Sequence, residues 1–240
     1  MTDFLKNSSL DDSESEIIRE QIIDLTRNYY QKIHSSKKFI SGKTVVPVSG
    51  KVFDEIELQL LISSSLDFCL TSDRFNKEFE KNLSSFLNSS FVLTTNSGSS
   101  ANLLAISALK SKELGQRSLN DGDEVITVAA GFPTTVNPLI QNNLVPVFID
   151  VKLGTYAVDE TKIENAITKK TKAIMLAHTL GNTFNLNYVK ELCKKYNLWL
   201  IEDCCDALGS TYENKHVGSF GDIGTLSFFP AHHITMGEGG

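Results

Sequence analysis

The sequence predicts an α/β fold with a mostly parallel sheet and helices on both faces. From residue 90 onwards, short β-rich runs alternate with segments of helical length, which is the pattern of parallel strands joined by crossover helices. The composition agrees, because 240 residues with 41% hydrophobic side chains are enough to bury a sizeable core.

The first fifty residues differ from the rest and are interpreted as an N-terminal extension with one helix and a connector. Residues 1–15 are polar and acidic, which favours a disordered tip. Apolar side chains near helical spacing predict a helix over about 16–34. The stretch 39–50 is interrupted by glycine and proline and is typical of an extended connector.

Two helices are expected next. Asp54, with Glu57 three residues later, predicts a capping box at the start of a helix that runs to about Phe68. A second helix is expected to start near Asp73. The apolar side chains that follow at helical spacing share one face of it: Phe75, Phe79, Leu83, Phe86 and Leu87.

Six strands are expected after residue 90: Phe91–Thr95, Glu124–Ala129, Val145–Asp150, Lys172–Ala177, Leu198–Asp203 and Thr225–Phe229. The helix-length segments between them are 100–113, 134–142, 159–168 and 186–196. The crossovers should be right-handed, whereas the strand order does not follow from the sequence. Ligands of such sheets bind outside the carboxyl ends of the strands, so the residues that follow each strand are the candidates for a site.

Charge and composition exclude several kinds of partner. The net charge of −6 is mild and no basic stripe is visible, which argues against nucleic acid. The N-terminus lacks the features of a signal peptide, and no uninterrupted apolar run is long enough to span a membrane. A cytoplasmic protein is therefore expected.

The cysteines give no metal pattern by spacing alone. Structural disulfides are not expected in a chain without a signal peptide, and no spacing is that of a zinc site. Buried thiols that act as small apolar side chains are the favoured interpretation. The four cysteines are Cys69, Cys193, Cys204 and Cys205.

The turn after the first expected strand is a candidate phosphate site. It contains Gly98, Ser99 and Ser100 and leads directly into a helical segment. Such a turn presents unpaired N–H groups at the positive end of the helix dipole, Gly98 would allow close approach of a ligand, and the serines add hydroxyl donors. A serine-capped turn without a ligand is an equal alternative.

Two other strand ends present groups that could contact a planar ligand. Phe132 follows the strand at 124–129, where its ring could stack on such a ligand, although an aromatic core residue is the commoner case. Asp203 ends the strand at 198–203, where its carboxylate could bind a protonated ring nitrogen, a ribose or a metal ion. Helix capping is the simpler alternative for Asp203.

The chain ends in two adjacent histidines and a glycine-rich turn. His232 and His233 follow Ser227 and the last expected strand, and a placed histidine suggests proton transfer. By themselves, surface or core histidines would be the better interpretation. Taken in order with the serine turn, the aromatic residue and Asp203, however, Ser227 and His232 suit a phosphorylated pyridine cofactor whose ring nitrogen Asp203 keeps protonated.

From about Gly50 to Gly240 the chain resembles the sugar aminotransferase and dehydratase family, also called DegT/DnrJ/EryC1/StrS. The resemblance lies in several motifs in a fixed order: Ser97–Ala101, Gly131–Thr135, Pro146–Val151, Ile201–Gly209 and Gly218–Phe228. It implies the large domain of fold-type I pyridoxal-phosphate enzymes over 51–240, incomplete because the family's small C-terminal domain is absent. It also implies cofactor contacts from Gly98, Ser99, Ser100, Phe132, Asp203, Asp206 and Ser227.

The chain departs from the aminotransferases at one position. His232 stands where they have a lysine, and no lysine occurs after Lys215. The resemblance therefore implies pyridoxamine phosphate held without a covalent link, with His232 as the catalytic base. The motifs are most like those of family members that remove the 3-hydroxyl of CDP-4-keto-6-deoxyglucose, towards the 3,6-dideoxyhexoses of lipopolysaccharide O-antigen.

Further partners are implied by the resemblance alone. They are a homodimer, a nucleotide-sugar substrate, a flavin/iron–sulfur reductase, and a 2Fe-2S cluster to which Cys205 would be one ligand while the others would lie beyond Gly240. Three alternatives stay open: a dehydratase of GDP-4-keto-6-deoxymannose, a sugar aminotransferase, and a non-catalytic remnant. The isolated chain is expected to be inactive or weak.

Overall fold

A computed structural model describes residues 12–34, 38–47, 52–69 and 71–240, and the chain divides into two compact units, Met1–Glu78 and Phe79–Gly240. The division near residue 50 made from the sequence stays a prediction. The expected disordered tip lies outside the described residues up to residue 11, whereas residues 12–15 are helical. No helix in the described ranges is both long and apolar enough to cross a membrane.

The first unit contains two helices that pack against each other, α1 (Asp12–Ile33) and α2 (Glu55–Leu66). The predicted capping box at α2 is confirmed. The Asp54 carboxylate accepts a hydrogen bond from Ile56 N at 2.7 Å, and the Glu57 carboxylate accepts one from Asp54 N at 2.8 Å. A third helix, α3 (Arg74–Leu87), begins within the first unit and ends in the second.

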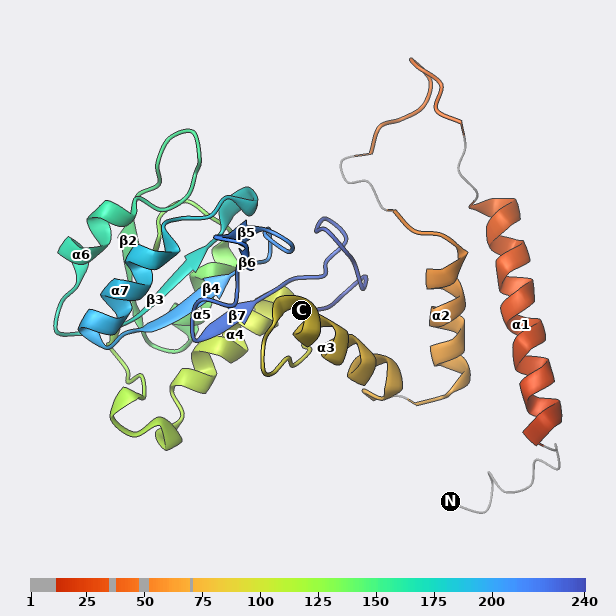
Figure 1. The fold of residues 1–240 in the computed structure, drawn as a ribbon, viewed down its shortest axis with the longest axis horizontal. Coiled ribbons are helices and arrows are strands. Elements are labelled where there is room, and N and C mark those ends of the chain that lie inside the picture. The colour runs from red at the N-terminus through yellow and green to blue at the C-terminus, as the bar shows by residue number, and fades with distance from the viewer. Residues whose placement is uncertain (1–11, 35–37, 48–51, 70) are drawn as a thin grey trace. The chain divides into compact units, whose positions relative to one another are not determined.

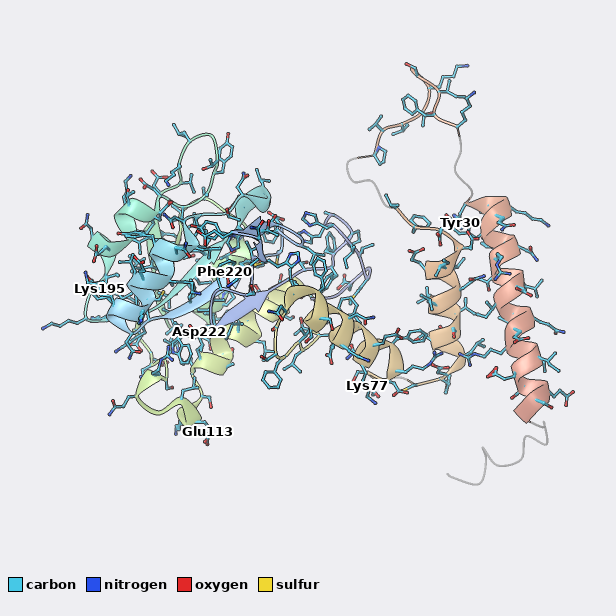
Figure 2. The ribbon with its side chains drawn as sticks, viewed as in Figure 1. Tyr30, Lys77, Glu113, Lys195, Phe220 and Asp222 are labelled. Carbon is cyan, nitrogen blue, oxygen red and sulfur yellow. The ribbon has the colours of Figure 1, made fainter. Side chains whose placement is uncertain are left out.

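The second unit is built on a five-stranded parallel sheet in the order β2-β1-β3-β4-β7 (Figure 1). Asp222, labelled in Figure 2, precedes the last of these strands. Its backbone N–H donates to Leu200 O at 2.8 Å, and its carboxylate accepts a hydrogen bond from Leu200 N at 2.9 Å. Two further strands, β5 (Thr211–Tyr212) and β6 (Lys215–His216), pair separately as an antiparallel hairpin. The sheet strands are β1 (Glu124–Val128), β2 (Val145–Ile149), β3 (Thr171–Ala177), β4 (Trp199–Asp203) and β7 (Ile223–Thr225).

Helices cover both faces of the sheet, as predicted. On one face, α4 (Gly98–Leu109) and α5 (Asn137–Gln141) pack against strand residues such as Val125 and Ile201. On the other face, α6 (Ile163–Ala166) and α7 (Leu186–Tyr196) pack against the alternate residues, Ile126, Ile174 and Leu200 among them. Short 3₁₀ segments occur at Lys112–Arg117, Pro133–Thr135, Glu160–Lys162 and Thr179–Gly181.

The prediction of a sheet strand at Phe91–Thr95 is wrong for this structure. The segment belongs to neither sheet, and Phe91 and Leu93 are 88% and 76% exposed. The composition of the segment favours a strand, but a strand also needs a partner with free ladder groups. Among the described residues, Gly240 alone pairs with it through backbone bonds, at Thr95. The last predicted strand is real but lies earlier and is shorter, as β7.

We expect Leu200→Ala to lower the free energy of unfolding by about 2–5 kcal/mol, because Leu200 is 2% exposed in β4 and its removal leaves a cavity under α7. Urea denaturation followed by circular dichroism measures this change. Ile140→Ala, at a position that is 60% exposed, is the control and should change the value by about 0.5 kcal/mol or less. Equal losses in the two variants would contradict this assignment of the core.

Candidate functional site

A cavity of about 550 Å³ lies at the carboxyl ends of β3 and β4, next to the start of α4. It brings together all but one of the site residues that the family resemblance implies, and Ser100 is the exception. Its wall also includes Ser97, Thr134, Thr135, His178 and Glu238. The predicted residues that line it are Gly98, Ser99, Phe132, Asp203, Cys205, Asp206, Ser227 and His232.

The start of α4 forms one end of the cavity. Ser97 is the N-cap, and its hydroxyl accepts a hydrogen bond from Ser100 N at 3.1 Å. The N–H groups of Gly98 and Ser99, in the first turn, have no acceptor within the helix, so this end favours an anion. From the sequence, a serine-capped turn and a phosphate-binding turn were alternative interpretations. The observed turn is compatible with both, because Ser97 caps the helix and the N–H groups of Gly98 and Ser99 remain available to a ligand.

Gly98 lies against Ser227, which follows β7. A Cβ at Gly98 would stand 2.5 Å from the Ser227 Cβ and 3.1 Å from the Cys205 Sγ, well inside van der Waals contact. A glycine is therefore required at this position by close packing. The contact places the Ser227 hydroxyl beside the first turn of α4, where it adds a donor to the anion-favouring end.

The carboxylate of Asp203 is buried and held by three hydrogen bonds. Its Oδ2 accepts from Asn102 Nδ2 at 2.9 Å and from Thr135 Oγ1 at 2.7 Å, and its Oδ1 accepts from Cys205 N at 3.1 Å. Asn102 is itself fixed, because its Oδ1 accepts from Thr225 Oγ1 at 2.6 Å. An ionised carboxylate offers about four acceptor positions, so one remains on Oδ1 for a group in the cavity.

Asn102 and Thr135 are functional candidates that the sequence analysis missed. Asn102 is fully buried, and Thr135 is 1% exposed. The available signal was a single amide within the otherwise small and apolar stretch 101–106, just after the serine turn. A buried amide needs hydrogen-bond partners, and in an α/β protein a strand-end carboxylate is an obvious one.

His232 lies on the cavity wall and is paired with a carboxylate. Its Nδ1 is 3.4 Å from Asp206 Oδ1, an ion-pair distance when the imidazole is protonated. This contact orients the ring and leaves Nε2 for another partner. The neighbouring His233 is exposed and does not line the cavity.

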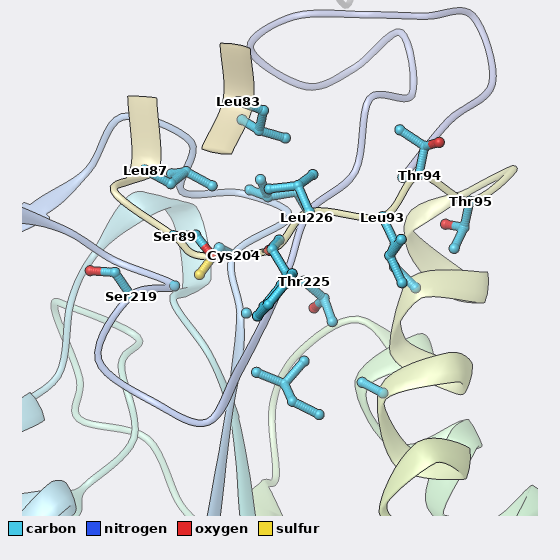
Figure 3. Close-up of a pocket in the computed structure, with 18 of the residues that line it drawn as sticks. Leu83, Leu87, Ser89, Leu93, Thr94, Thr95, Cys204, Ser219, Thr225 and Leu226 are labelled. Carbon is cyan, nitrogen blue, oxygen red and sulfur yellow. Dashed lines mark hydrogen bonds between the residues drawn. The ribbon is translucent and has the colours of Figure 1, made fainter. Parts of the chain in front are cut away.

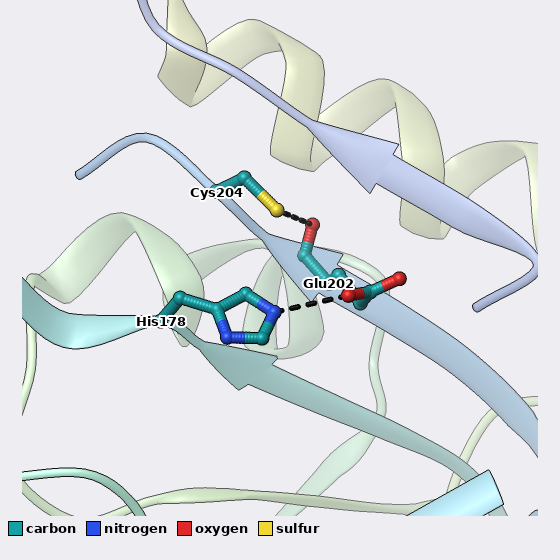
Figure 4. Close-up of side chains that lie close together, drawn as sticks. All are labelled: His178, Glu202 and Cys204. Carbon is teal, nitrogen blue, oxygen red and sulfur yellow. Dashed lines mark hydrogen bonds and ion pairs between the residues drawn. The ribbon is translucent and has the colours of Figure 1, made fainter. Parts of the chain in front are cut away.

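Glu202 precedes Asp203 in β4 and has a different environment. Its Oε1 accepts from Phe220 N at 2.8 Å and Gly221 N at 2.6 Å, and its Oε2 accepts from Gly218 N at 2.9 Å and His178 Nε2 at 3.0 Å (Figure 4). Burial by itself would raise the pKa of Glu202, but the bonds from His178, Gly218 and Gly221 outweigh it and hold the pKa below its usual value.

His178, Glu202 and Cys204 offer ligand atoms within 4.8 Å of one another, but hydrogen bonding explains the group better than a metal ion. Four N–H donors already occupy the Glu202 oxygens. The Cys204 thiol points to the Glu202 carbonyl at 3.7 Å, and burial raises the pKa of that thiol well above its usual value, so the thiolate needed for a metal is disfavoured.

Cys204 and Cys205 contribute to different cavities. Cys205 lines the candidate site, whereas Cys204 lines a second groove beside β7. Burial raises the pKa of the Cys205 thiol, and the Asp203 charge raises it further. An iron–sulfur cluster requires several thiolates around one point, so the described residues do not fit a 2Fe-2S cluster.

The comparisons with known proteins agree with the fold and motifs. The sequence profile of the DegT/DnrJ/EryC1/StrS aminotransferase family matches residues 54–240. The lipopolysaccharide biosynthesis protein RfbH of Salmonella typhimurium is 63% identical over 223 residues, which cover 93% of this chain and 51% of the relative. A dTDP-4-dehydro-2,6-dideoxy-D-glucose 3-dehydratase of Saccharopolyspora spinosa is 47% identical, with 92% and 48% covered.

A solved structure is similar over the same region. The Escherichia coli GDP-4-keto-6-deoxy-D-mannose-3-dehydratase with bound hydrated PLP superposes with a TM-score of 0.77 at 33% identity. The match covers 81% of this chain and 50% of that one. The chain thus spans about half the length of the relatives it matches.

We expect Glu202→Gln to lower the free energy of unfolding at neutral pH by about 1–3 kcal/mol, because an amide cannot accept all four bonds. Folding lowers the pKa of Glu202. The ionised carboxylate therefore stabilises the fold above its unfolded pKa of about 4.3, and this contribution is lost as pH falls through the folded pKa.

Urea unfolding between about pH 3 and pH 7 measures this effect. The acid-side fall should be shallower in Glu202→Gln than in the parent chain. Glu191→Gln, on the exposed side of α7, is the control and should follow the parent curve. Parallel curves for the parent and Glu202→Gln would show that this carboxylate contributes nothing to the pH dependence.

Proposed function

The chain belongs to the DegT/DnrJ/EryC1/StrS aminotransferase family, and on this premise we propose that it forms the cofactor-binding part of a pyridoxamine-phosphate-dependent sugar 3-dehydratase. The substrate class is a nucleotide-linked 4-keto-6-deoxyhexose, with CDP-4-keto-6-deoxyglucose as the member that the motifs favour. The observation that supports this most is that His232 lies on the wall of the same cavity as the Asp203 carboxylate. By the resemblance of the motifs, His232 takes the position of the lysine of the aminotransferases.

The residues of the cavity fit pyridoxamine or pyridoxal 5′-phosphate. The N–H groups of Gly98 and Ser99, with the Ser227 hydroxyl, suit the phosphate. Phe132 is 71% exposed at the cavity wall, free to cover a ring. The open acceptor position on Asp203 suits a protonated ring nitrogen. When bound, the cofactor supplies an electron sink for carbanion chemistry.

The role proposed for Asp203 requires a carboxylate that is held in one orientation. Asn102 and Thr135 both donate to its Oδ2, and the Cys205 N–H donates to its Oδ1. These three donors fix the carboxylate and leave one acceptor position on Oδ1 open, which supports the role that we propose for Asp203. Asn102 and Thr135 act through Asp203 and are positioning residues.

His232 is proposed as the base of the reaction. The nearby Asp206 carboxylate orients the imidazole through Nδ1, so that Nε2 is available to move a proton in the cavity. Loss of the 3-hydroxyl as water requires such proton transfer. Asp206, which the resemblance gives as a cofactor contact, then acts on the imidazole.

The relatives differ in the nucleotide of their sugars. The relative that is 47% identical is named for a dTDP-linked sugar, and a relative that is 34% identical is named for a GDP-linked sugar. We propose the CDP-linked sugar because the motifs of this chain favour it. On the same basis we propose a role in O-antigen biosynthesis, a homodimer, a cytoplasmic location and a reductase as partner. The missing lysine disfavours the aminotransferase alternative. The remnant alternative predicts no binding of pyridoxamine phosphate by residues 1–240.

We expect His232→Asn to bind pyridoxamine phosphate as the parent does but to lose dehydration by at least about 100-fold, because it removes the base while keeping a polar side chain. His233→Asn, at the exposed neighbouring position, is the matched control and should keep the parent activity. Binding is measured by calorimetry on residues 1–240, and release of the 3-hydroxyl by mass spectrometry.

The activity assay uses this chain joined after Gly240 to the second half of the Salmonella typhimurium relative, since the chain covers 51% of that protein. CDP-, dTDP- and GDP-linked 4-keto-6-deoxyhexoses are compared side by side. Amino transfer from glutamate to the sugar, faster than dehydration, would contradict the proposal. Equal losses in His232→Asn and His233→Asn would contradict the role of His232.

We expect His232→Lys to attach pyridoxal phosphate covalently, because the introduced amine would stand where the family's aminotransferases have their lysine. Borohydride reduction followed by peptide mass spectrometry detects the adduct, and its site must be position 232. His233→Lys is the control and should stay unmodified at equal cofactor concentration. Absence of an adduct in His232→Lys would count against the placement of His232 beside the cofactor.

A further inference from the structure

An exposed leucine in the loop after β3 has a backbone conformation that leucine rarely adopts. Leu180 has a φ of 56° and a ψ of 25°, and it is 69% exposed. In this left-handed region the Cβ crowds the backbone, so few residue types other than glycine and asparagine adopt it. An exposed apolar side chain makes few contacts that could offset the strain, and positions strained in this way cluster at functional sites.

The neighbours of the leucine hold the loop in this conformation. Ser210 Oγ donates to Gly181 O at 3.0 Å, and Gly181 N donates to His178 O at 3.0 Å. The side chain of Asn182 donates through Nδ2 to Thr155 O at 2.9 Å. The leucine could reach a relaxed conformation only if such bonds were lost, so its exposed position is imposed by the surrounding structure.

This loop lies at the edge of the candidate site, whereas the groove beside β7 (Figure 3) does not include it. Thr179 lines the candidate cavity, and a Cβ at Gly181 would stand 3.3 Å from the backbone oxygen of Asp206. Asp206 also lines the cavity and contacts Nδ1 of His232. Leu180 follows the wall residue Thr179 without being part of the wall, so its side chain lies at the rim of the cavity on the Asp206 side.

The substrate class of the proposed function carries an apolar group that a leucine at this rim would fit. A 6-deoxyhexose has a methyl group on C5, where an ordinary hexose has a hydroxymethyl group. C5 is bonded to C4, the carbonyl carbon, and C4 is bonded to the C3 that loses its hydroxyl. Since His232 is the proposed base of that reaction, the methyl group comes close to the side of the cavity where Asp206 and Leu180 lie.

We propose that Leu180 is a specificity-determining residue that contacts the C6 methyl group of the sugar. The inference rests on the proposed function and deepens it. A leucine side chain stabilises a methyl group by apolar contact, whereas the hydroxyl of a hydroxymethyl group would leave water and find no hydrogen-bond partner on the leucine. The strained loop thus presents an apolar side chain to the part of the sugar in which 6-deoxyhexoses differ from other hexoses.

The test measures binding of two sugar nucleotides that differ only in the oxygen on C6, CDP-6-deoxyglucose and CDP-glucose. Neither has a 4-ketone, so neither reacts. Calorimetry is done on the joined full-length chain of the activity assay, loaded with pyridoxamine phosphate. We expect the parent to bind the 6-deoxy sugar at least about tenfold more tightly. Leu180→Asn, which keeps the size of the side chain but removes its apolar surface, should reduce this preference to about threefold or less.

Two variants serve as controls. Leu180→Met keeps an apolar side chain and should keep the preference. Phe68→Asn changes a residue of the first unit that is also left-handed and exposed, with a φ of 48° and 80% exposure, and it should keep the preference too. A preference that survives in Leu180→Asn, or no preference in the parent, overturns the role of Leu180 and leaves the proposed function standing. Failure of the parent to bind either sugar overturns the proposed substrate class, and this inference with it.

A stability measurement separates this role from a structural one. Asparagine tolerates the left-handed conformation better than leucine does. The urea midpoint of residues 1–240 should therefore be at or above the parent value in Leu180→Asn. A lower midpoint would show that the leucine side chain stabilises the chain itself, which would overturn the proposal that the strained loop serves substrate binding.

Discussion

The carboxylate of Glu202 is the interaction on which the second unit depends. It accepts three backbone N–H groups from the turn at 218–221 and one imidazole N–H from the end of β3, and both the Glu202 and His178 side chains are fully buried. A buried charge without such partners would destabilise the fold by several kcal/mol. With them, it fixes the turn that leads into β7 and so decides where Ser227 lies.

The candidate site follows from the alternation of side chains along β4. Because neighbouring residues of a strand face opposite sides, Glu202 holds the turn while Asp203 faces α4 and the cavity. Two adjacent carboxylates thereby have different tasks and different donors. Backbone N–H groups and an imidazole hold Glu202, whereas an amide, a hydroxyl and one backbone N–H hold Asp203. The same alternation separates Cys204 from Cys205.

Much of the fold was predictable, because alternating strands and helices leave a strong pattern, and five of the six expected strands are present near their expected positions. The strand order could not be predicted, because it depends on which strands become neighbours in the folded sheet. Phe91–Thr95 failed for a related reason: its residue types favour a strand, but pairing depends on a neighbour that the sequence pattern does not reveal. Of the site, the motifs predicted the cavity residues, whereas Asn102 and Thr135 became visible only once their bonds to Asp203 were known.

The contact between Gly98 and Ser227 has a consequence for how the site can vary. With 2.5 Å between the Ser227 Cβ and any Cβ added at position 98, the two residues share one volume although they are far apart in the sequence. In mutational terms they behave as a single position. A library that varies position 98 alone will return mainly glycine, whereas one that varies both positions can recover alanine at 98 together with glycine at 227. Such a pair would lack the hydroxyl that Ser227 presents to the cavity.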